Sequence, residues 1–290
     1  MSTLTTERLS GDTSMGAVTL RVADPDAMIA YYRDAVTLSV QHQSADRAVL
    51  GRGQLPLVVL EHAPELRHAA PRQAGLFHTA ILFETEADLS AAVYASATRN
   101  SGSFTGSADH LVSKAFYFTD PEGNGVELYW DRARTEWSWT HGRVEMATLM
   151  LDPNRYLAEH LNEEAVAHAH ERPAKVGHVH LCVGDIPGAR RFYVDQLGFE
   201  TTAELGDQAL FVSAGRYHHH MAMNTWTSAG AGRRRLALGL GLVRIELPGA
   251  EDLGALGERL SHYRVGTRDD GRTVSFDDPW LNRIEVSVKT

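Results

Sequence analysis

Apolar and polar residues alternate along several short segments of this chain, and each such segment leads into a stretch with helical spacing. The segments that begin at Val18 and Val179 show this most clearly. Each has apolar side chains at every second position, then a turn with Asp, then a helical pattern that contains an aromatic pair, Tyr31–Tyr32 or Phe192–Tyr193. Period-two alternation is typical of a half-buried strand, and spacing of three to four residues is typical of an amphipathic helix. Both segments therefore predict a strand followed by a helix.

These two segments are copies of each other, offset by 161 residues throughout. A second pair of copies closes each half of the chain: DPEGNGVELYW from Asp120 and DPWLNRIEVSV from Asp278 both carry a Glu seven residues after the Asp, at Glu127 and Glu285. Such repetition predicts four similar structural units, each with one strand, one helix and three more strands. The units cover residues 16–62, 76–131, 176–226 and 236–288.

A single βαβββ unit forms a curled sheet that needs a partner to close a core. The predicted fold class is therefore α+β, with four tandem βαβββ modules that form two half-barrel-type domains. The predicted divisions are a disordered lead-in over 1–15, an N-terminal domain over 16–131, a helical linker over 132–175 and a C-terminal domain over 176–290. Within the linker, Asp152 as N-cap and Pro153 in the first turn predict a helix that ends before Pro173.

Composition narrows the classes of partner and the compartment. The net charge of −9 argues against a nucleic-acid surface, because phosphate binding needs clustered Lys and Arg. Cys182 is the one cysteine, which excludes an intrachain disulfide and fits a reducing cytoplasm. The sequence has no apolar run long enough for a signal peptide or a membrane span, so we expect a cytoplasmic protein with no membrane partner.

Histidine is the unusual residue type, with 15 copies, several of them inside alternating strands. Strand parity puts His178 and His180 on one face, and His78 opens the corresponding strand of the second unit. Glu127 and Tyr129 share a face of a closing strand by the same argument. In the segment 218–224 the two methionines mark the helix side, which predicts that His218 and His220 face the concave side of the sheet.

The chain resembles the vicinal oxygen chelate superfamily, which includes glyoxalases, bleomycin resistance proteins and extradiol dioxygenases. The resemblance covers nearly everything after residue 15 and is closest to the two-domain bacterial catechol-2,3-dioxygenases. The motifs that carry it are LFHTAILF from Leu76, DHLVSKAFYFTDPEGNGVELYWDR from Asp109, GHVHL from Gly177, FYVDQLGF from Phe192 and FVSAGRYHHH from Phe211.

The resemblance implies one divalent metal ion, with ligands from the opening and closing strands of paired units. If units two and three pair, the metal ligands are His78, Glu127, His178 and His220. If units three and four pair, Glu285 replaces His78 and Glu127, and a pairing of units one and two leaves too few ligands. We favour units two and three. Two His and one carboxylate suit Fe(II) or Mn(II), whereas a four-residue set suits Zn(II) or Ni(II).

The resemblance also places His110 and Ser113 near a substrate. We expect His110 and His180 to handle protons as catalytic residues, and a second group to bind substrate: Ser113, Tyr129, Tyr217 and His218.

The resemblance implies extradiol ring cleavage of a catechol-like aromatic by O₂, with Fe(II) as the cofactor. Homodimers are common for this architecture, although the sequence itself carries no interface signal. One alternative is a metal-dependent lyase or isomerase of glyoxalase type, with Mn, Zn or Ni. The other alternative is a metal-free protein that binds an aromatic drug. Four protein ligands would favour the lyase.

Overall fold

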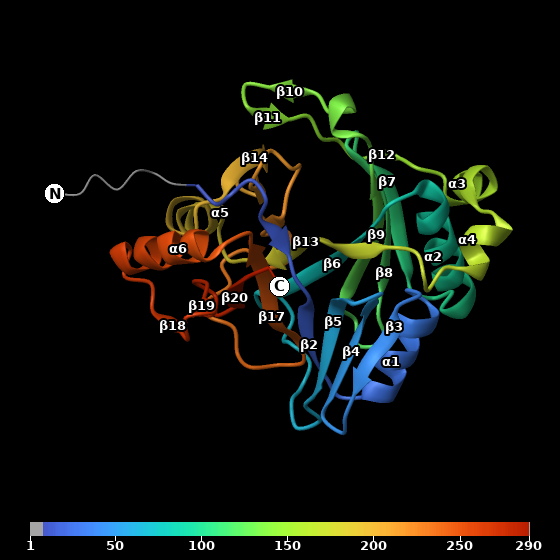
Figure 1. Cartoon of the computed structure of the whole chain (residues 1–290), viewed down its shortest axis with the longest axis horizontal. Helices are drawn as coiled ribbons and strands as arrows, with labels where there is room; N and C mark the ends of the chain where they lie inside the picture. The colour runs from blue at the N-terminus through green and yellow to red at the C-terminus, as the bar shows by residue number, and fades with distance from the viewer. Residues whose placement is uncertain (1–7, 290) are drawn as a thin grey trace.

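The computed structural model describes residues 8–289, which form two nine-stranded sheets and a separate two-stranded hairpin. Figure 1 shows the strands in the middle of the molecule, with α5 and α6 on one side and α1 to α4 on the other. The mixed, sheet-rich architecture agrees with the α+β class and the βαβββ units that the repeats predict.

The first half of the chain contains units one and two, and unit one has a short additional strand before its expected start at residue 16. Unit one contains β1 (Ser14–Met15), β2 (Val18–Val22), α1 (Pro25–Asp34), β3 (Ser39–Gln43), β4 (Arg47–Arg52) and β5 (Leu55–His62). Unit two contains β6 (Gly75–Phe83), α2 (Glu86–Arg99), β7 (Phe104–Asp109), β8 (Ser113–Thr119) and β9 (Gly125–Asp131).

The linker and the second half follow. The linker contains η1 (Arg134–Glu136), β10 (Trp139–Thr140), β11 (Arg143–Val144), β12 (Leu149–Met150), α3 (Pro153–His160) and α4 (Glu163–Ala167). Unit three contains β13 (Ala174–Cys182), α5 (Ile186–Arg190), the π-helical turn η2 (Arg191–Gln196), β14 (Glu200–Leu205), β15 (Ala209–Ser213) and β16 (Met221–Asn224). Unit four contains β17 (Gly239–Leu247), α6 (Ala250–His262), β18 (Thr267–Asp269), β19 (Thr273–Asp277) and β20 (Arg283–Val288).

Each large sheet joins one unit from each half of the chain. One sheet has the order β12-β7-β8-β9-β6-β13-β16-β15-β14, so units two and three meet where β6 pairs antiparallel with β13. The other has the order β18-β19-β20-β17-β2-β5-β4-β3, so units one and four meet where β17 pairs with β2. The pairing of units two and three is the arrangement favoured from the histidine pattern.

A buried tyrosine–aspartate bond is repeated within each half. Tyr32 Oη donates to Asp120 Oδ2 at 3.2 Å, and Tyr193 Oη donates to Asp278 Oδ2 at 2.9 Å. Both aspartates also accept backbone N–H groups of the turn that follows them. The repeated sequence is therefore explained by a repeated contact, in which the helix of one unit is tied to the closing turn of the next.

The start of the described chain packs on the body, which corrects the expectation of a loose lead-in for residues 8–15. Leu9 is buried, and Leu9 N–H donates to Gly198 O at 2.9 Å. Ser14–Met15 adds a short strand to β17. Residues 1–7 of the expected lead-in lie outside the described residues.

The linker helix is broken in two, where the sequence predicted one. Asp152 caps α3 as expected, but the backbone of Leu161 is extended and Asn162 caps a second helix, with its side chain accepting from Ala165 N–H at 2.8 Å. A polar residue that can cap a new helix competes with continuation of the old one, which explains the break.

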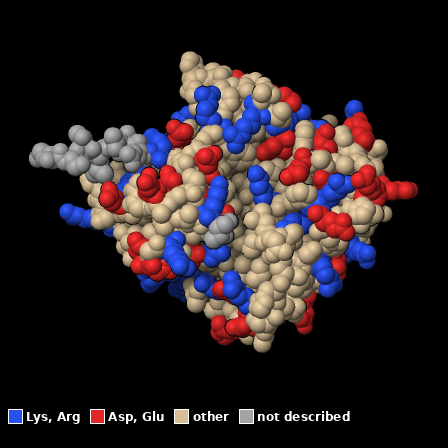
Figure 2. All heavy atoms as spheres, viewed as in Figure 1, with Lys and Arg blue, Asp and Glu red and all other residues tan. Residues whose placement is uncertain are grey.

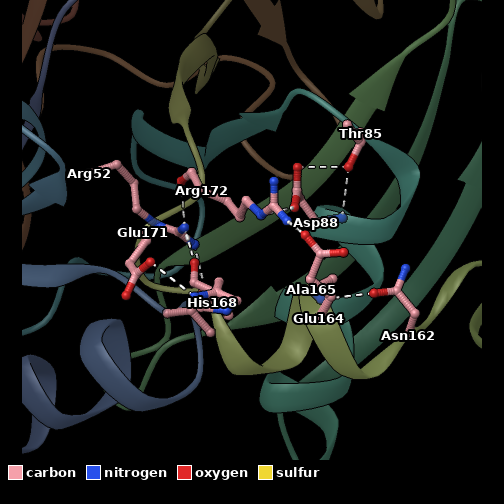
Figure 3. Close-up of polar contacts among 11 residues, drawn as sticks. Arg52, Thr85, Asp88, Asn162, Glu164, Ala165, His168, Glu171 and Arg172 are labelled. Atoms are coloured by element: carbon pink, nitrogen blue, oxygen red, sulfur yellow. Dashed lines mark hydrogen bonds and ion pairs between the residues drawn. The ribbon is translucent and has the colours of Figure 1, made fainter.

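The segment that follows the second linker helix is fastened to units one and two, which form the first half of the chain (Figure 3). The buried guanidinium of Arg52, on β4, donates to the carbonyl oxygens of Ala169 and Arg172. Arg172 in turn lies 3.7 Å from Asp88 on α2, measured from Nε to Oδ1. The contacts therefore join unit one, the linker and unit two.

The character of the described helices and the distribution of charge on one face bear on contact with a membrane or with a charged partner. Within residues 8–289 no helix combines the length and the apolar character that a bilayer crossing requires. On the face drawn in Figure 2, acidic and basic side chains are interspersed rather than gathered by sign.

Candidate metal centre

Two imidazoles and one carboxylate converge on the concave face of the sheet built by units two and three. They are His78 on β6, Glu127 on β9 and His178 on β13, which are neighbouring strands. Glu127 Oε2 lies 2.9 Å from His78 Nε2 and 3.0 Å from His178 Nε2. All three side chains are buried, and Glu127 is 2% exposed.

A glycine allows the strands to come this close. Gly125 lies beside His78 in the parallel pairing of β9 with β6. A Cβ at position 125 would lie 2.1 Å from the carbonyl oxygen of Phe77 and 2.9 Å from the Cβ of His78. The glycine in DPEGNG is therefore required by packing, and it lets Glu127, two residues further on, reach the two imidazoles.

A bulge at Gly177 changes the register in which β13 pairs with β6. The register of β13 with β6 shifts between Val176 and His178, which leaves Gly177 as the extra residue. A Cβ at position 177 would lie 1.7 Å from the hydroxyl oxygen of Tyr129. The bulge thus makes room for Tyr129 and sets the direction of His178.

The electrostatics suit a cation. Burial by itself would raise the pKa of Glu127, but the neighbouring imidazoles of His178 and His78 hold it well below its usual range. Burial lowers the pKa of His178 to about 4, against the opposing attraction of Glu127. At neutral pH the group is therefore one ionised carboxylate with a neutral imidazole at His178, which is the protonation state that metal ligation requires.

The residues present fit a divalent ion. His78 Nε2 is buried and makes no hydrogen bond, although it lies beside the carboxylate of Glu127. A buried imidazole nitrogen without a hydrogen-bond partner is costly, and a metal ion between the nitrogens and the carboxylate would satisfy it. Two His and one carboxylate form the ligand set typical of non-haem Fe(II) sites that keep open positions.

His110 and Tyr117 stand beside this group. His110 Nδ1 lies 2.7 Å from Ala147 O, and Nε2 lies 2.7 Å from Tyr117 Oη. The carbonyl can only accept, so Nδ1 of His110 donates, and in the neutral imidazole Nε2 accepts from the Tyr117 hydroxyl. Tyr117 is the cross-strand neighbour of Glu127, and its ring lies 5.7 Å from that of His78. Ser113 is buried at the start of the same strand, β8.

His180 occupies the same face as His178, as strand parity predicts. Its ring centroid is 4.9 Å from that of His78, and its Nε2 lies 3.0 Å from Asn224 Nδ2. The amide of Asn224 donates, so His180 Nε2 is an acceptor with its partner already in place.

A chain of polar groups lies beside His178, whose ring centroid is 4.9 Å from that of Tyr129 and 5.9 Å from that of His218. Tyr129 Oη is 2.7 Å from Tyr217 Oη, which donates to Asp131 Oδ2 at 2.8 Å. Asp131 Oδ1 lies 2.9 Å from His218 Nε2. The residues expected to bind substrate, Tyr129, Tyr217 and His218, are thus held by one another and by Asp131. Sequence reasoning missed Asp131, although it follows Tyr129 at the strand spacing of two.

Comparison with known proteins places this arrangement in a family. The family model for the Glyoxalase/Bleomycin resistance protein/Dioxygenase superfamily matches residues 14–128 and 175–286. The chain belongs to this superfamily. It is 32% identical over 273 residues to the catechol-2,3-dioxygenase of Bacillus subtilis (strain 168), covering 92% of this chain and 94% of that protein.

Solved structures of the superfamily share the fold. A candidate dioxygenase from Bacillus subtilis superposes with a TM-score of 0.65, covering 97% of this chain and 86% of that one at 14% identity. Glyoxalase I from Zea mays superposes with a TM-score of 0.59, covering 96% of this chain and 92% of that one at 15% identity. At these identities the structures establish the common architecture rather than a common reaction.

His220 does not join the other three expected ligands of the superfamily site. Its Nδ1 accepts the backbone N–H of Ala214 at 3.2 Å, and its ring lies 4.9 Å from that of Tyr217. The neighbouring His219 is the one whose ring lies near His178, at 4.1 Å between centroids. The parity argument failed because β16 begins only at Met221, so strand alternation does not extend back to 220.

The alternative carboxylate is also elsewhere. Glu285 lies on β20 in the sheet of units one and four, where Arg244 Nε donates to Glu285 Oε1 at 2.8 Å. Among residues 8–289, His78, Glu127 and His178 form the one group of three or more potential ligands close enough to share an ion.

Proposed function

We propose that this protein is a non-haem Fe(II) extradiol dioxygenase that opens the ring of a catechol-like aromatic with O₂. The observation that carries the proposal is the buried group of His78, Glu127 and His178, without a fourth side chain from the described residues. Three protein ligands leave positions for a substrate with two adjacent oxygens and for O₂. The four-residue set that would favour the glyoxalase-type alternative lacks His220, which binds the backbone of Ala214 instead. Similarity to a catechol-2,3-dioxygenase over most of the chain supports the same reaction class.

When bound, Fe(II) would supply the redox-active centre and the Lewis acid that the reaction needs. Glu127 provides one negative charge against the two of the cation, and His78 and His178 add no charge when neutral. A catecholate substrate would then bind a centre that is still net positive, which favours loss of a phenolic proton.

Residues beside the metal group, rather than the metal ligands themselves, would take up the proton that the substrate oxygen loses. His110 Nε2 accepts a hydrogen bond from the hydroxyl of Tyr117, and this hydroxyl lies on the concave face next to Glu127. The pair can take up a proton from a substrate oxygen at Tyr117 Oη while Nε2 of His110 receives the tyrosine proton. His180 is less suited to this role, because its Nε2 is already bonded to Asn224.

Apolar side chains complete the surroundings of the site. A small cluster consists of Ala80, Ala115 and Tyr129, with Leu82 and Tyr117 packed on it. Because these side chains share the concave face with Glu127, they exclude water from the space next to the carboxylate and strengthen its electrostatic interactions.

The test is oxygen uptake by protein purified without oxygen and reconstituted with Fe(II). Substituted catechols should drive O₂ consumption and formation of a yellow ring-opened product, and protein loaded with Zn(II) should show neither. His78→Ala should lose both bound iron and activity, whereas His220→Ala should retain iron. Metal binding without O₂ uptake on any catechol would overturn the proposal.

A further inference from the structure

The aromatic rings of Phe77 and Trp226 lie at one edge of the metal group and have no part in the proposed metal binding or proton transfer. The ring centroid of Phe77 lies 5.3 Å from that of His78, 4.9 Å from that of His180 and 5.3 Å from that of Trp226. Trp226 lies 5.4 Å from His180. The ring pairs are each arranged edge to face, which the charge distribution of aromatic rings favours: Phe77–His180, Phe77–Trp226 and His180–Trp226.

A strand irregularity brings Phe77 to this face. Phe77 precedes His78 directly, so in a regular strand the two side chains would point to opposite sides. The pairing of β6 with β13 skips Phe77, since His180 is opposite His78 while Leu181 is opposite Leu76. This bulge turns Phe77 toward the same side as His78.

Trp226 is held in place by the turn that follows β16. The side chain of Asn224 accepts the backbone N–H of Trp226 at 3.2 Å through Oδ1, and its Nδ2 binds His180. Ser228, later in the same turn, donates from Oγ to Val183 O at 2.8 Å. The indole is therefore fixed relative to His180 and, through Phe77, to His78.

The outer side of this pair is not covered by the protein. Trp226 is 47% exposed although one edge packs on His180 and Phe77, and Phe77 is only partly buried. A rigid aromatic surface beside a potential metal ligand is suited to receive a flat apolar group that reaches the metal through its own oxygens. An aliphatic chelator would leave the same surface unused.

We propose that Phe77 and Trp226 form an aromatic wall that packs against the ring of the substrate and selects aromatic over aliphatic ligands with adjacent oxygens. This inference rests on the proposed function for the identity of the substrate. It assigns Phe77 and Trp226 a role in specificity, separate from metal ligation by His78 and proton transfer by Tyr117.

The test compares two chelators on anaerobic, Fe(II)-loaded protein by calorimetry. The first, 4-methylcatechol, presents a ring, and the second, acetohydroxamate, binds through adjacent oxygens without one. Trp226→Leu and Phe77→Leu should each weaken 4-methylcatechol binding by about five- to tenfold, the size of an aromatic pair contact. Affinity for acetohydroxamate and iron content should be unchanged. Tyr94→Leu, at an exposed aromatic on α2, is the matched control and should change neither affinity.

The outcomes separate the wall from the proposed reaction. Equal loss of both chelators, or no loss of either, overturns the wall even if wild-type protein consumes O₂ with catechols. Selective loss of 4-methylcatechol in a protein that takes up no O₂ supports the wall and overturns the dioxygenase. Wild-type protein that binds no catechol overturns both.

Discussion

Replacement of Glu127 by Gln should abolish the stabilisation that a divalent ion gives this protein. The substitution keeps the size of the side chain and removes the charge that lies 2.9 Å from His78 and 3.0 Å from His178. The ion then meets two neutral imidazoles and an amide, and affinity should fall by a factor on the order of 100 or more.

The expected change in melting temperature follows from mass action. An ion at 100 times its Kd stabilises the native state by about 2.7 kcal/mol. An unfolding entropy of about 2.1 cal/mol/K per residue gives about 0.6 kcal/mol/K for a chain of 290 residues. Wild-type protein should therefore melt about 4.5 °C higher with the ion than without it. In Glu127→Gln the same ion concentration is near the weakened Kd, so the ion stabilises the native state by only about 0.4 kcal/mol. The melting temperature should then rise by less than about 1 °C.

The assay is a calorimetric or fluorescence melt with and without Fe(II) or Mn(II), in the absence of oxygen. Glu285→Gln is the matched control, because it makes the same chemical change at the repeated position, where Arg244 rather than an ion faces the carboxylate. It should retain the full metal-dependent shift. A metal-dependent shift that survives in Glu127→Gln, or disappears in Glu285→Gln, would refute the assignment of the site.

Two further predictions concern packing and pH. Gly177→Ala should destabilise the protein by about 1–3 kcal/mol in urea unfolding, because the new Cβ would lie 1.7 Å from the hydroxyl oxygen of Tyr129; Gly102→Ala, where the space is open, should not. Burial lowers the pKa of His220 from 6.5 to about 3. Between these two pH values the unfolded chain therefore protonates His220, whereas the native state keeps it neutral. Native stability should thus fall as pH drops from about 6.5 toward about 3, by up to about 1.36 kcal/mol per pH unit from this residue. His220→Asn, which can still accept from Ala214, should make the slope shallower by that amount, and an unchanged slope would contradict the argument.

The three convergent residues were predictable from the sequence because the bulges at Gly177 and Phe77 precede the two histidines, and the alternation from each histidine to the next strand positions is intact. His78, Glu127 and His178 occur where alternation is unbroken on the relevant side, and the repeat identifies equivalent positions in other units. Parity alone then gives the face of the sheet. The choice of units two and three as partners needed one more step, namely that this pairing keeps both opening-strand histidines together.

The remainder of the site could not be predicted because it depends on irregular backbone. Arg216 has a positive φ of 55°, and regular pairing begins only at Met221, so nothing in the triple histidine says which ring approaches His178. Phe77 reaches the concave face only through a bulge, and a bulge changes parity without a marker in the sequence. Asp131 acquires its role from contacts with residues more than 80 positions away.

The two copies of the closing-strand glutamate, Glu127 and Glu285, differ in the groups that surround them. In the sheet of units two and three, Glu127 is fully enclosed with two imidazoles, an arrangement that lacks a permanent positive charge until an ion binds. In the sheet of units one and four, Arg244 stands opposite Glu285 in the parallel pairing and supplies that charge from the chain itself.

A buried carboxylate is costly without a partner. Partly buried Glu285 is paired with Arg244, whereas buried Glu127 lies beside His78 and His178, where a cation would lower the cost of its burial. The guanidinium of Arg244 pairs the Glu285 carboxylate within the chain itself. The duplicated architecture therefore offers two similar sheets, of which the sheet with His78, Glu127 and His178 is the one whose donor set remains free for metal chemistry.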